Sequence, residues 1–222
     1  MGSEYMKRHH WDLIWIIPLM MIILGCSHSR GLQHSLYPEY VGSIRTVLVL
    51  PPELGVFQMA TDGTRIWHED YSRATGAALL QAVVINLTAK RLRVHIADEQ
   101  LMREPETQRL QALFRAVQRS IQLHIQGPQP FPAKLRTFDY ELGPVTDLLE
   151  RYAADALVIA LGQQIFSEDQ SNSWIGIAVI EPQGRLIWYN KVSERTDMGI
   201  DNSHETSNLV DSVLHSFAKE VL

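Results

Sequence analysis

Residues 156–161 read Ala-Leu-Val-Ile-Ala-Leu, an apolar run with almost no alternation between apolar and polar positions. A strand that is covered on both faces shows this pattern, so the run predicts a strand near the centre of a sheet. Two further strands, at Trp174–Ile180 and Leu186–Asn190, flank Glu181-Pro182-Gln183-Gly184, in which Pro presets φ and Gly allows a left-handed turn residue. The C-terminal half therefore predicts an antiparallel meander that begins at a buried strand.

Upstream of this run, predicted strands and helices alternate. Arg45–Leu50 has the pattern of a buried strand closed by two prolines, and Asp62-Gly63 is a tight-turn pair between Val56–Met59 and Arg65–Trp67, which predicts a small hairpin. The other predicted elements are a strand at residues 92–97 and helices at residues 69–90, 105–126, 144–152 and 204–221. This order predicts one α/β domain of three or two layers, with a mixed, partly parallel sheet, a C-terminal antiparallel meander and packing helices.

The N-terminus has the features of a secretory signal peptide. Leu13–Leu24 (LIWIIPLMMIIL) is apolar throughout and follows a short basic stretch. Crossing a bilayer takes about 20 apolar residues in a helix, so this shorter run, interrupted by Pro18, favours a cleaved signal over a membrane span. We predict a signal peptide over residues 1–25, with Met1 and Met6 both open as the start.

The end of the apolar run contains the single cysteine of the chain. Ile23-Leu24-Gly25-Cys26 resembles the lipobox of bacterial lipoproteins, in which two aliphatic or small residues and one small residue precede Cys. The resemblance implies cleavage between Gly25 and Cys26, diacylation of the Cys26 thiol and acylation of the new N-terminus, for example by palmitate. Several acyl chains hold a protein at a bilayer far more firmly than one.

The resemblance also bears on localisation and on the boundary of the folded domain. Ser27 stands where an Asp would favour retention in the inner membrane, which implies the periplasmic face of the outer membrane and leaves the inner membrane open. Ser27–Ser43 has scattered polar residues and no apolar period. We therefore predict a lipidated N-terminus and tether over residues 26–43 and a periplasmic domain over residues 44–222.

Two short segments of the domain carry a second resemblance. Ala154-Asp155-Ala156-Leu157-Val158 leads into a strand, and Glu181–Trp188 (EPQGRLIW) forms a turn and the strand after it. Both are similar to segments of the periplasmic domain shared by the curli secretion lipoprotein and the penicillin-binding-protein activator lipoproteins. The resemblance extends in element order from Ile44 to Leu222. It implies a domain that binds another protein in envelope assembly, secretion or cell-wall regulation.

Composition excludes several classes of function. The net charge of −5, from 20 Lys and Arg against 25 Asp and Glu, argues against nucleic-acid binding. A single Cys excludes an internal disulfide, a Cys-based zinc site and an iron–sulfur cluster within one chain. His68-Glu69 and His204-Glu205 lack the second His, four residues after the first, that a zincin helix needs. We predict no metal and no other cofactor.

The chain also lacks catalytic motifs. Nucleophile-elbow, Walker and dinucleotide-binding patterns are absent. Ser216 and Lys219 match the Ser-x-x-Lys spacing of penicillin-binding enzymes, but Phe217 facing the core would explain that spacing without chemistry. We therefore expect no enzymatic activity, and an envelope hydrolase with an unrecognised site stays a third alternative.

Three tryptophans of the predicted domain have two interpretations. Packing between sheet and helices is the expected role of Trp67, Trp174 and Trp188. Alternatively, Trp67 on the hairpin is a candidate partner contact, because exposed aromatic side chains dominate interface energetics. The leading hypothesis is a non-enzymatic outer-membrane lipoprotein that binds or assembles another protein in the periplasm. The alternative is an oligomeric auxiliary lipoprotein of a secretion or transport complex.

Overall fold

The structure, a computed structural model, describes residues 31–128, 131–196 and 203–217. Its strands are β1 (Leu32–Gln33), β2 (Thr46–Val49), β3 (Glu53–Met59), β4 (Arg65–Trp67), β5 (Arg93–Ile96), β6 (Ala156–Phe166), β7 (Ser171–Ile180) and β8 (Leu186–Thr196). Its helices are α2 (Tyr37–Val41), α3 (Glu69–Ala89), α4 (Glu99–Arg103), α5 (Pro105–His124), α6 (Pro132–Arg136), α7 (Thr146–Arg151) and α8 (Ser203–Leu214). The predicted signal peptide and the predicted lipobox at Ile23–Cys26 lie outside the described residues.

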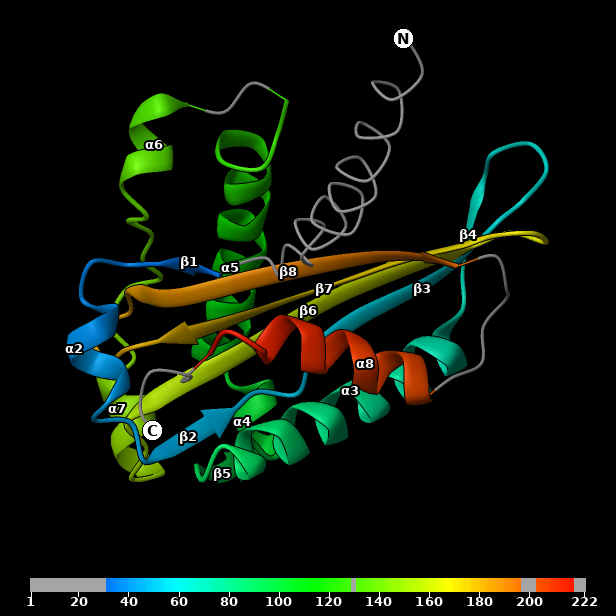
Figure 1. The fold of residues 1–222 in the computed structure, drawn as a ribbon. Helices are drawn as coiled ribbons and strands as arrows, with labels where there is room; N and C mark the ends of the chain where they lie inside the picture. The colour runs from blue at the N-terminus through cyan, green and yellow to red at the C-terminus, as the bar shows by residue number, and fades with distance from the viewer. Residues whose placement is uncertain (1–30, 129–130, 197–202, 218–222) are drawn as a thin grey trace, which may run out of the picture.

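All strands belong to one mixed sheet that is organised around β6 (Figure 1). The strand order is β1-β8-β7-β6-β2-β5, with β3 paired to β6 beyond the end of β2. The β6–β7, β7–β8 and β8–β1 pairs are antiparallel, whereas β2 is parallel to both β5 and β6. The prediction of a mixed sheet with a central strand at residues 156–161 and a C-terminal meander is confirmed.

Helices cover both faces of the sheet, so the domain has three layers (Figure 1). On one face, α2, α3 and α8 pack on the inward side chains of the strands, and Val158 and Trp188 lie in that core. On the other face, α4, α5 and α7 pack on a second core that contains Leu157 and Tyr189. Successive residues of β6 alternate between the two cores, as the period of a strand requires.

The segment just before Ile44 corrects the predicted domain boundary. Leu32 pairs with Tyr189 in an antiparallel β1–β8 ladder, and the side chain of Tyr37 is 1% exposed in the core beneath α2. Residues 31–43 are therefore part of the folded domain rather than of a tether. A two-residue strand and a one-turn helix are too short to display an apolar period, which explains why the pattern of this segment resembled a linker.

The remaining differences concern the ends of elements. The predicted helix and hairpin boundaries between residues 56 and 124 agree with α3, α5, β3 and β4 to within a few residues, but α4 was not predicted. The β6–β8 meander runs further than predicted because its distal part continues in polar residues such as Gln163 and Asn172. Among the described helices, none combines the length and apolar character that crossing a bilayer requires.

Candidate functional site

The offset between β2 and β3 creates an open sheet edge. Both strands run parallel to β6, β2 opposite Ala156–Val158 and β3 opposite Leu161–Phe166, and Pro51-Pro52 separates them. Beyond β2 the sheet continues into β5, whereas within the described residues β3 pairs on its outer side only with the short strand β4, from Phe57 onward. The first residues of β3 therefore form an edge between two helix-covered faces.

A serine from α3 ends the ladder between β3 and β4. The backbone N–H of His68 donates to the Val56 carbonyl over 3.0 Å, and the Val56 N–H donates to Ser72 Oγ over 2.9 Å. The Ser72 hydroxyl donates in turn to the His68 carbonyl over 2.7 Å and accepts the indole N–H of Trp67 over 3.0 Å. Ser72 thus replaces one strand–strand hydrogen bond with a bridge and fixes the Trp67 ring.

The next outward-facing residue on β3 is Leu54. Backbone groups of a strand point to alternate sides, so the N–H and C=O of Leu54 point the same way as those of Val56, away from β6. In the described part of the chain no backbone hydrogen bond reaches Leu54 from outside the β3–β6 ladder. This edge can accept a further strand.

A groove of about 810 Å³ runs along this edge, which we call the β3-edge groove. One wall comes from α3, where Gly76 and Ala77 leave room beside the strand, and a Cβ at Gly76 would approach the Pro52 carbonyl to 3.9 Å. The opposite wall comes from α5 and from Trp174 of β7. The residues that line it are Pro51, Pro52, Glu53, Leu54, Gly55, Phe57, Trp67, Glu69, Ser72, Arg73, Gly76, Ala77, Leu80, Arg115, Gln118, Arg119, Leu161, Gly162, Gln163 and Trp174.

Arginines outnumber carboxylates around the groove. Arg115 of α5 reaches across to Glu53 of β3, with an Nη1–Oε1 distance of 2.6 Å, and Arg73 forms an ion pair of 3.0 Å with Glu69 on the surface of α3. Arg119 adds a third cation to the lining. An acidic residue on a bound segment would therefore find favourable charge at this edge.

The three tryptophans have different surroundings. Trp188 is fully buried beside Phe217, which confirms the packing prediction for that residue and the inward position of Phe217. Trp174 is half-buried, donates to Gln163 Oε1 over 3.4 Å and lies beneath the Lys191 ammonium, which is 4.6 Å from its ring centroid. Burial lowers the pKa of Lys191.

Trp67 is 57% exposed at the end of the β3-edge groove, so the packing prediction is wrong for this residue. Its role as a partner contact stays a prediction. His68, beside it, interacts through Nε2 with Gln58 Oε1 over 3.2 Å. Within the described residues no group of three or more His, Cys, Asp or Glu side chains is arranged to hold a metal ion.

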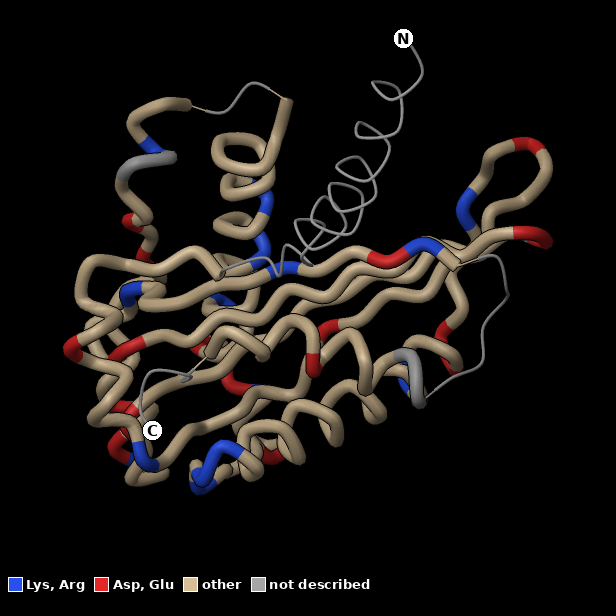
Figure 2. Tube along the Cα trace, in the orientation of Figure 1, with Lys and Arg blue, Asp and Glu red and all other residues tan. Residues whose placement is uncertain are grey.

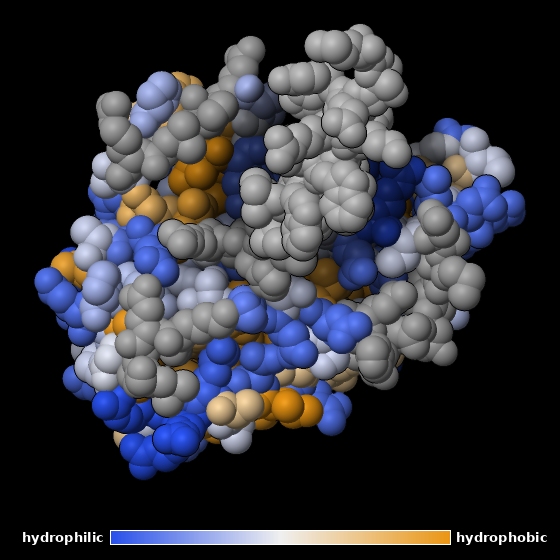
Figure 3. Space-filling view, in the orientation of Figure 1, coloured by the Kyte–Doolittle hydropathy of each residue, from blue (hydrophilic) through white to orange (hydrophobic). Residues whose placement is uncertain are grey.

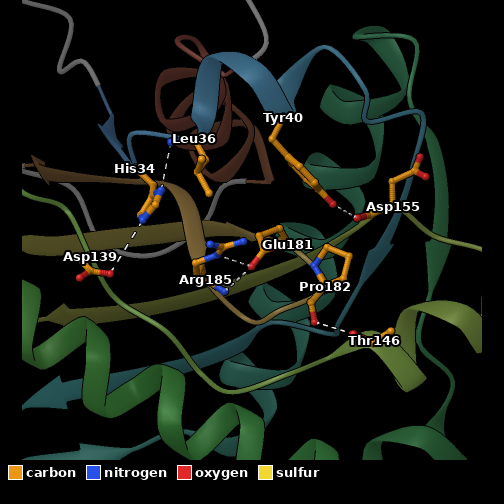
Figure 4. Close-up of polar contacts among 9 residues, drawn as sticks. All are labelled: His34, Leu36, Tyr40, Asp139, Thr146, Asp155, Glu181, Pro182 and Arg185. Carbon is orange, nitrogen blue, oxygen red and sulfur yellow. Dashed lines mark hydrogen bonds and ion pairs between the residues drawn. The ribbon is translucent and has the colours of Figure 1, made fainter.

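Polar contacts gather at the opposite end of β7 and β8, near Asp155 and near the Glu181–Arg185 turn (Figure 4). Tyr40 of α2 donates its hydroxyl to the Asp155 carbonyl, and Asp155 Oδ2 accepts the backbone N–H groups of Arg45 and Thr46, both over 2.8 Å. Burial, with the nearby carboxylates of Glu181 and Asp155, raises the pKa of Tyr40 to about 12.

The β7–β8 turn contributes further contacts (Figure 4). Glu181 is buried, and its Oε1 accepts the Arg185 Nε–H over 2.9 Å and the Arg185 backbone N–H over 3.1 Å. Burial alone would raise the pKa of Glu181, but the hydrogen bonds from Arg185 and the turn backbone lower it overall. Thr146 Oγ1 donates to the Pro182 carbonyl over 3.0 Å. Each of these groups has a hydrogen-bond partner within the fold, so the contacts stabilise the packing of α2, α7 and the β7–β8 turn.

No protein-family model and no curated protein matches the sequence. Among solved structures, a PelC dodecamer from Paraburkholderia phytofirmans is 10% identical with a TM-score of 0.43, covering 78% of this chain and 86% of that one. Lipoprotein GNA1162 from Neisseria meningitidis is 16% identical with a TM-score of 0.34, covering 80% and 99%. The LpoB C-terminal domain from Salmonella enterica is 12% identical with a TM-score of 0.28, covering 72% and 92%. Similarity at this level assigns neither a family nor a function.

Proposed function

We propose that this chain is a non-enzymatic lipoprotein, anchored through Cys26 at the periplasmic face of the outer membrane, whose domain binds another envelope protein in the β3-edge groove. The observation that carries the binding role is the open backbone edge at Leu54, which lies in a groove that ends at the exposed indole of Trp67. The anchor rests on the lipobox at Ile23–Cys26.

The geometry of the groove favours an extended segment as the occupant. A peptide that adds to the edge of a sheet gains main-chain hydrogen bonds, and its alternate side chains enter pockets on one face. Leu54 would supply the main-chain donor and acceptor, and Trp67 is an aromatic anchor that Ser72 already orients. The excess of arginines in the lining favours a segment that contains an acidic residue.

A matched pair of variants tests the groove. Ala77 lines the groove, whereas Ala74 is exposed on the same helix outside it. Ala77→Leu would fill the space beside β3, and Ala74→Leu makes the same change where no ligand would lie. With a photo-crosslinking residue placed at position 67, we expect one specific envelope protein to be captured in whole cells, and we expect Ala77→Leu to abolish capture while Ala74→Leu preserves it. Equal capture by both variants would remove the groove from the proposal.

The lipid anchor is tested separately. Cys26→Ala, or treatment with the signal-peptidase inhibitor globomycin, should leave an unprocessed precursor and remove the mature protein from the outer-membrane fraction. Unchanged processing and fractionation would refute the anchor and leave the groove experiment unaffected.

The alternative function, an oligomeric auxiliary lipoprotein of a secretion or transport complex, has one structural observation in its favour. In the described residues β5 pairs only with β2, so its outer edge is open, and Ile96 on it is exposed. A second copy could pair there. Native mass measurement on the mature protein distinguishes the two, because a ring requires a defined multiple of the monomer mass.

A further inference from the structure

The side chains at the open edge of β3 alternate between two different surroundings. The side chain of Leu54 packs against the core that α3 covers, whereas its neighbour Glu53 bonds to Arg115 of α5. Because successive residues of a strand point to opposite faces, Gly55 faces the same side as Glu53, toward α5. Directly opposite residues of paired strands share a face. A strand added at this edge would therefore follow the same alternation, and each of its side chains would meet a defined part of the β3-edge groove.

The position opposite Gly55 has an apolar surrounding. A Cβ at Gly55 would lie 2.7 Å from Cε2 of Phe57, so the Phe57 ring lies over the bare backbone of Gly55. Trp67 is the cross-strand partner of Phe57, and Ser72 holds its exposed indole at the end of the groove. An added strand would lie on the same side of β3 as β4, so the side chain opposite Gly55 would come next to these two rings. An apolar side chain, and an aromatic one above all, gains most by packing there.

The position opposite Glu53 has a cationic surrounding. Arg115 is already paired with Glu53, over 2.6 Å between Nη1 and Oε1. Arg119 follows one turn later on the same side of α5 and lines the groove, and its guanidinium has no ion pair or hydrogen bond within the part of the chain that the structure describes. After Glu106, α5 has no acidic residue, and Figure 2 shows blue segments along it. In Figure 3 strongly hydrophilic and hydrophobic residues lie next to each other over α5. The excess of positive charge favours a carboxylate on a bound strand.

The position between these two, opposite Leu54, faces the other wall of the groove. Its side chain would point toward α3, where Gly76, Ala77 and Leu80 line the groove after the Glu69–Arg73 ion pair. Gly76 lies close to the strand, since a Cβ there would be 3.9 Å from the Pro52 carbonyl. A small, uncharged side chain suits this position.

We propose that the β3-edge groove recognises an extended segment in which an apolar and an acidic residue stand two positions apart, with a small uncharged residue between them. The apolar side chain packs on Phe57 and Trp67, and the acidic one pairs with Arg119. This proposal rests on the groove of the proposed function and adds the sequence class of the partner. A spacing of three positions would send the two side chains to opposite faces of the bound strand. A strand antiparallel to β3 carries the apolar residue first, and a parallel strand carries the acidic residue first.

The experiment measures peptide binding to the mature lipidated protein in detergent micelles, by fluorescence anisotropy of labelled peptides. Short peptides of one composition, rich in Ser, Thr and Ala, contain Phe-Ala-Glu, Glu-Ala-Phe or Phe-Ala-Ala-Glu at their centre, and a fourth contains Phe-Ala-Gln. We expect one of the first two to bind about three- to tenfold more tightly than the last two, because a charge-assisted hydrogen bond is formed only in the correct register. The order that binds more tightly reports the direction of the added strand.

A charge reversal on α5 assigns the acidic position. Arg119→Glu should remove the preference for Glu over Gln and should favour a peptide with Phe-Ala-Lys, or with Lys-Ala-Phe if the strand is parallel. The matched control is Arg109→Glu, because Arg109 is exposed on the same helix but lies outside the groove. This control should keep the preference of the unsubstituted protein.

The outcomes separate the recognition pattern from the groove itself. Equal affinity for spacings of two and three positions, with binding still abolished by Ala77→Leu, would refute the pattern and leave the groove intact. Equal effects of Arg119→Glu and Arg109→Glu would also overturn the assignment to Arg119. Binding that Ala77→Leu leaves unchanged, or no binding of any peptide at millimolar concentration, would remove the groove and the pattern together.

Discussion

The Tyr189 hydroxyl of β8 lies over Gly176 of β7, so closely that a Cβ at position 176 would stand 2.9 Å from Tyr189 Oη. Gly176 is required here by a close approach rather than by its backbone conformation. The hydroxyl is buried and has no hydrogen-bond partner among the described residues, and burial raises the pKa of Tyr189. Because Gly176 has no side chain, the centre of the meander has room for the Tyr189 hydroxyl.

Gly176→Ala should destabilise the domain, because the added methyl group overlaps the Tyr189 hydroxyl in a closely packed core. Overpacking of this kind costs about 1–3 kcal/mol. Tyr189→Phe removes an unsatisfied buried group and should raise the free energy of unfolding by about 1 kcal/mol. Urea denaturation of both single variants and the double variant checks this, since the double variant should recover much of the loss. If the two substitutions changed the free energy of unfolding by strictly additive amounts, the inferred contact between positions 176 and 189 would be contradicted.

Ser72→Ala should destabilise the β3–β4 hairpin and release the Trp67 indole. The Val56 N–H would lose its acceptor in a buried position, which costs about 1–3 kcal/mol. Hydrogen exchange at Val56 should accelerate, and Trp67 fluorescence should become more accessible to quenchers. Ser72→Thr, which keeps the hydroxyl, is the control. Unchanged exchange in Ser72→Ala would mean that the bridge contributes nothing to the edge.

The fold could be predicted where single segments carry an unambiguous period or turn signal. The run at residues 156–161 and the Glu181–Gly184 turn identified the central strand and the meander because burial on both faces and a tight turn leave local signatures. The prediction of a tether was wrong for residues 31–43, because the structure of this segment depends on contacts with β8 and the core, which are distant in sequence.

The candidate site was largely inaccessible from the sequence. The β3-edge groove exists because β2 and β3, close together in the chain, pair with successive parts of β6 about a hundred residues later. No local pattern reports such an offset. Pro51-Pro52 and the small residues Gly76 and Ala77 inside a helix were the available signals, and only Trp67 was identified as a candidate contact.

Acid should destabilise the domain through Glu181. The hydrogen bonds from Arg185 and the turn backbone outweigh burial and hold the pKa of Glu181 below the ordinary value of a glutamate. A carboxylate whose pKa is lower in the folded state stabilises the fold above its unfolded pKa, and this contribution is lost as pH falls through the folded pKa. We expect the melting temperature to fall as the pH drops below about 4.5. Glu181→Gln should lower the melting temperature at neutral pH and make it depend less on pH in the acid range. If the melting temperature of Glu181→Gln fell in acid as steeply as that of the unsubstituted protein, other carboxylates would be responsible for the loss of stability.

A domain that begins at Ile44 should be less stable than one that begins at Gly31. The shorter chain lacks β1 and α2, which removes the buried side chains of Tyr37 and Val41 and exposes the outer edge of β8. Burying one such side chain contributes about 1.5–3 kcal/mol, so the loss should be several kcal/mol and should appear as a lower melting temperature, with a tendency to associate through the unpaired β8 edge. Thermal denaturation and light scattering of the two forms measure this directly. Tyr37→Ala in the longer form is the control that removes the core contact while keeping β1, and it should lower the melting temperature without promoting association. Equal stability of the two forms would mean that residues 31–43 act as a tether. A tether of that length would let the domain lie further from its lipid anchor.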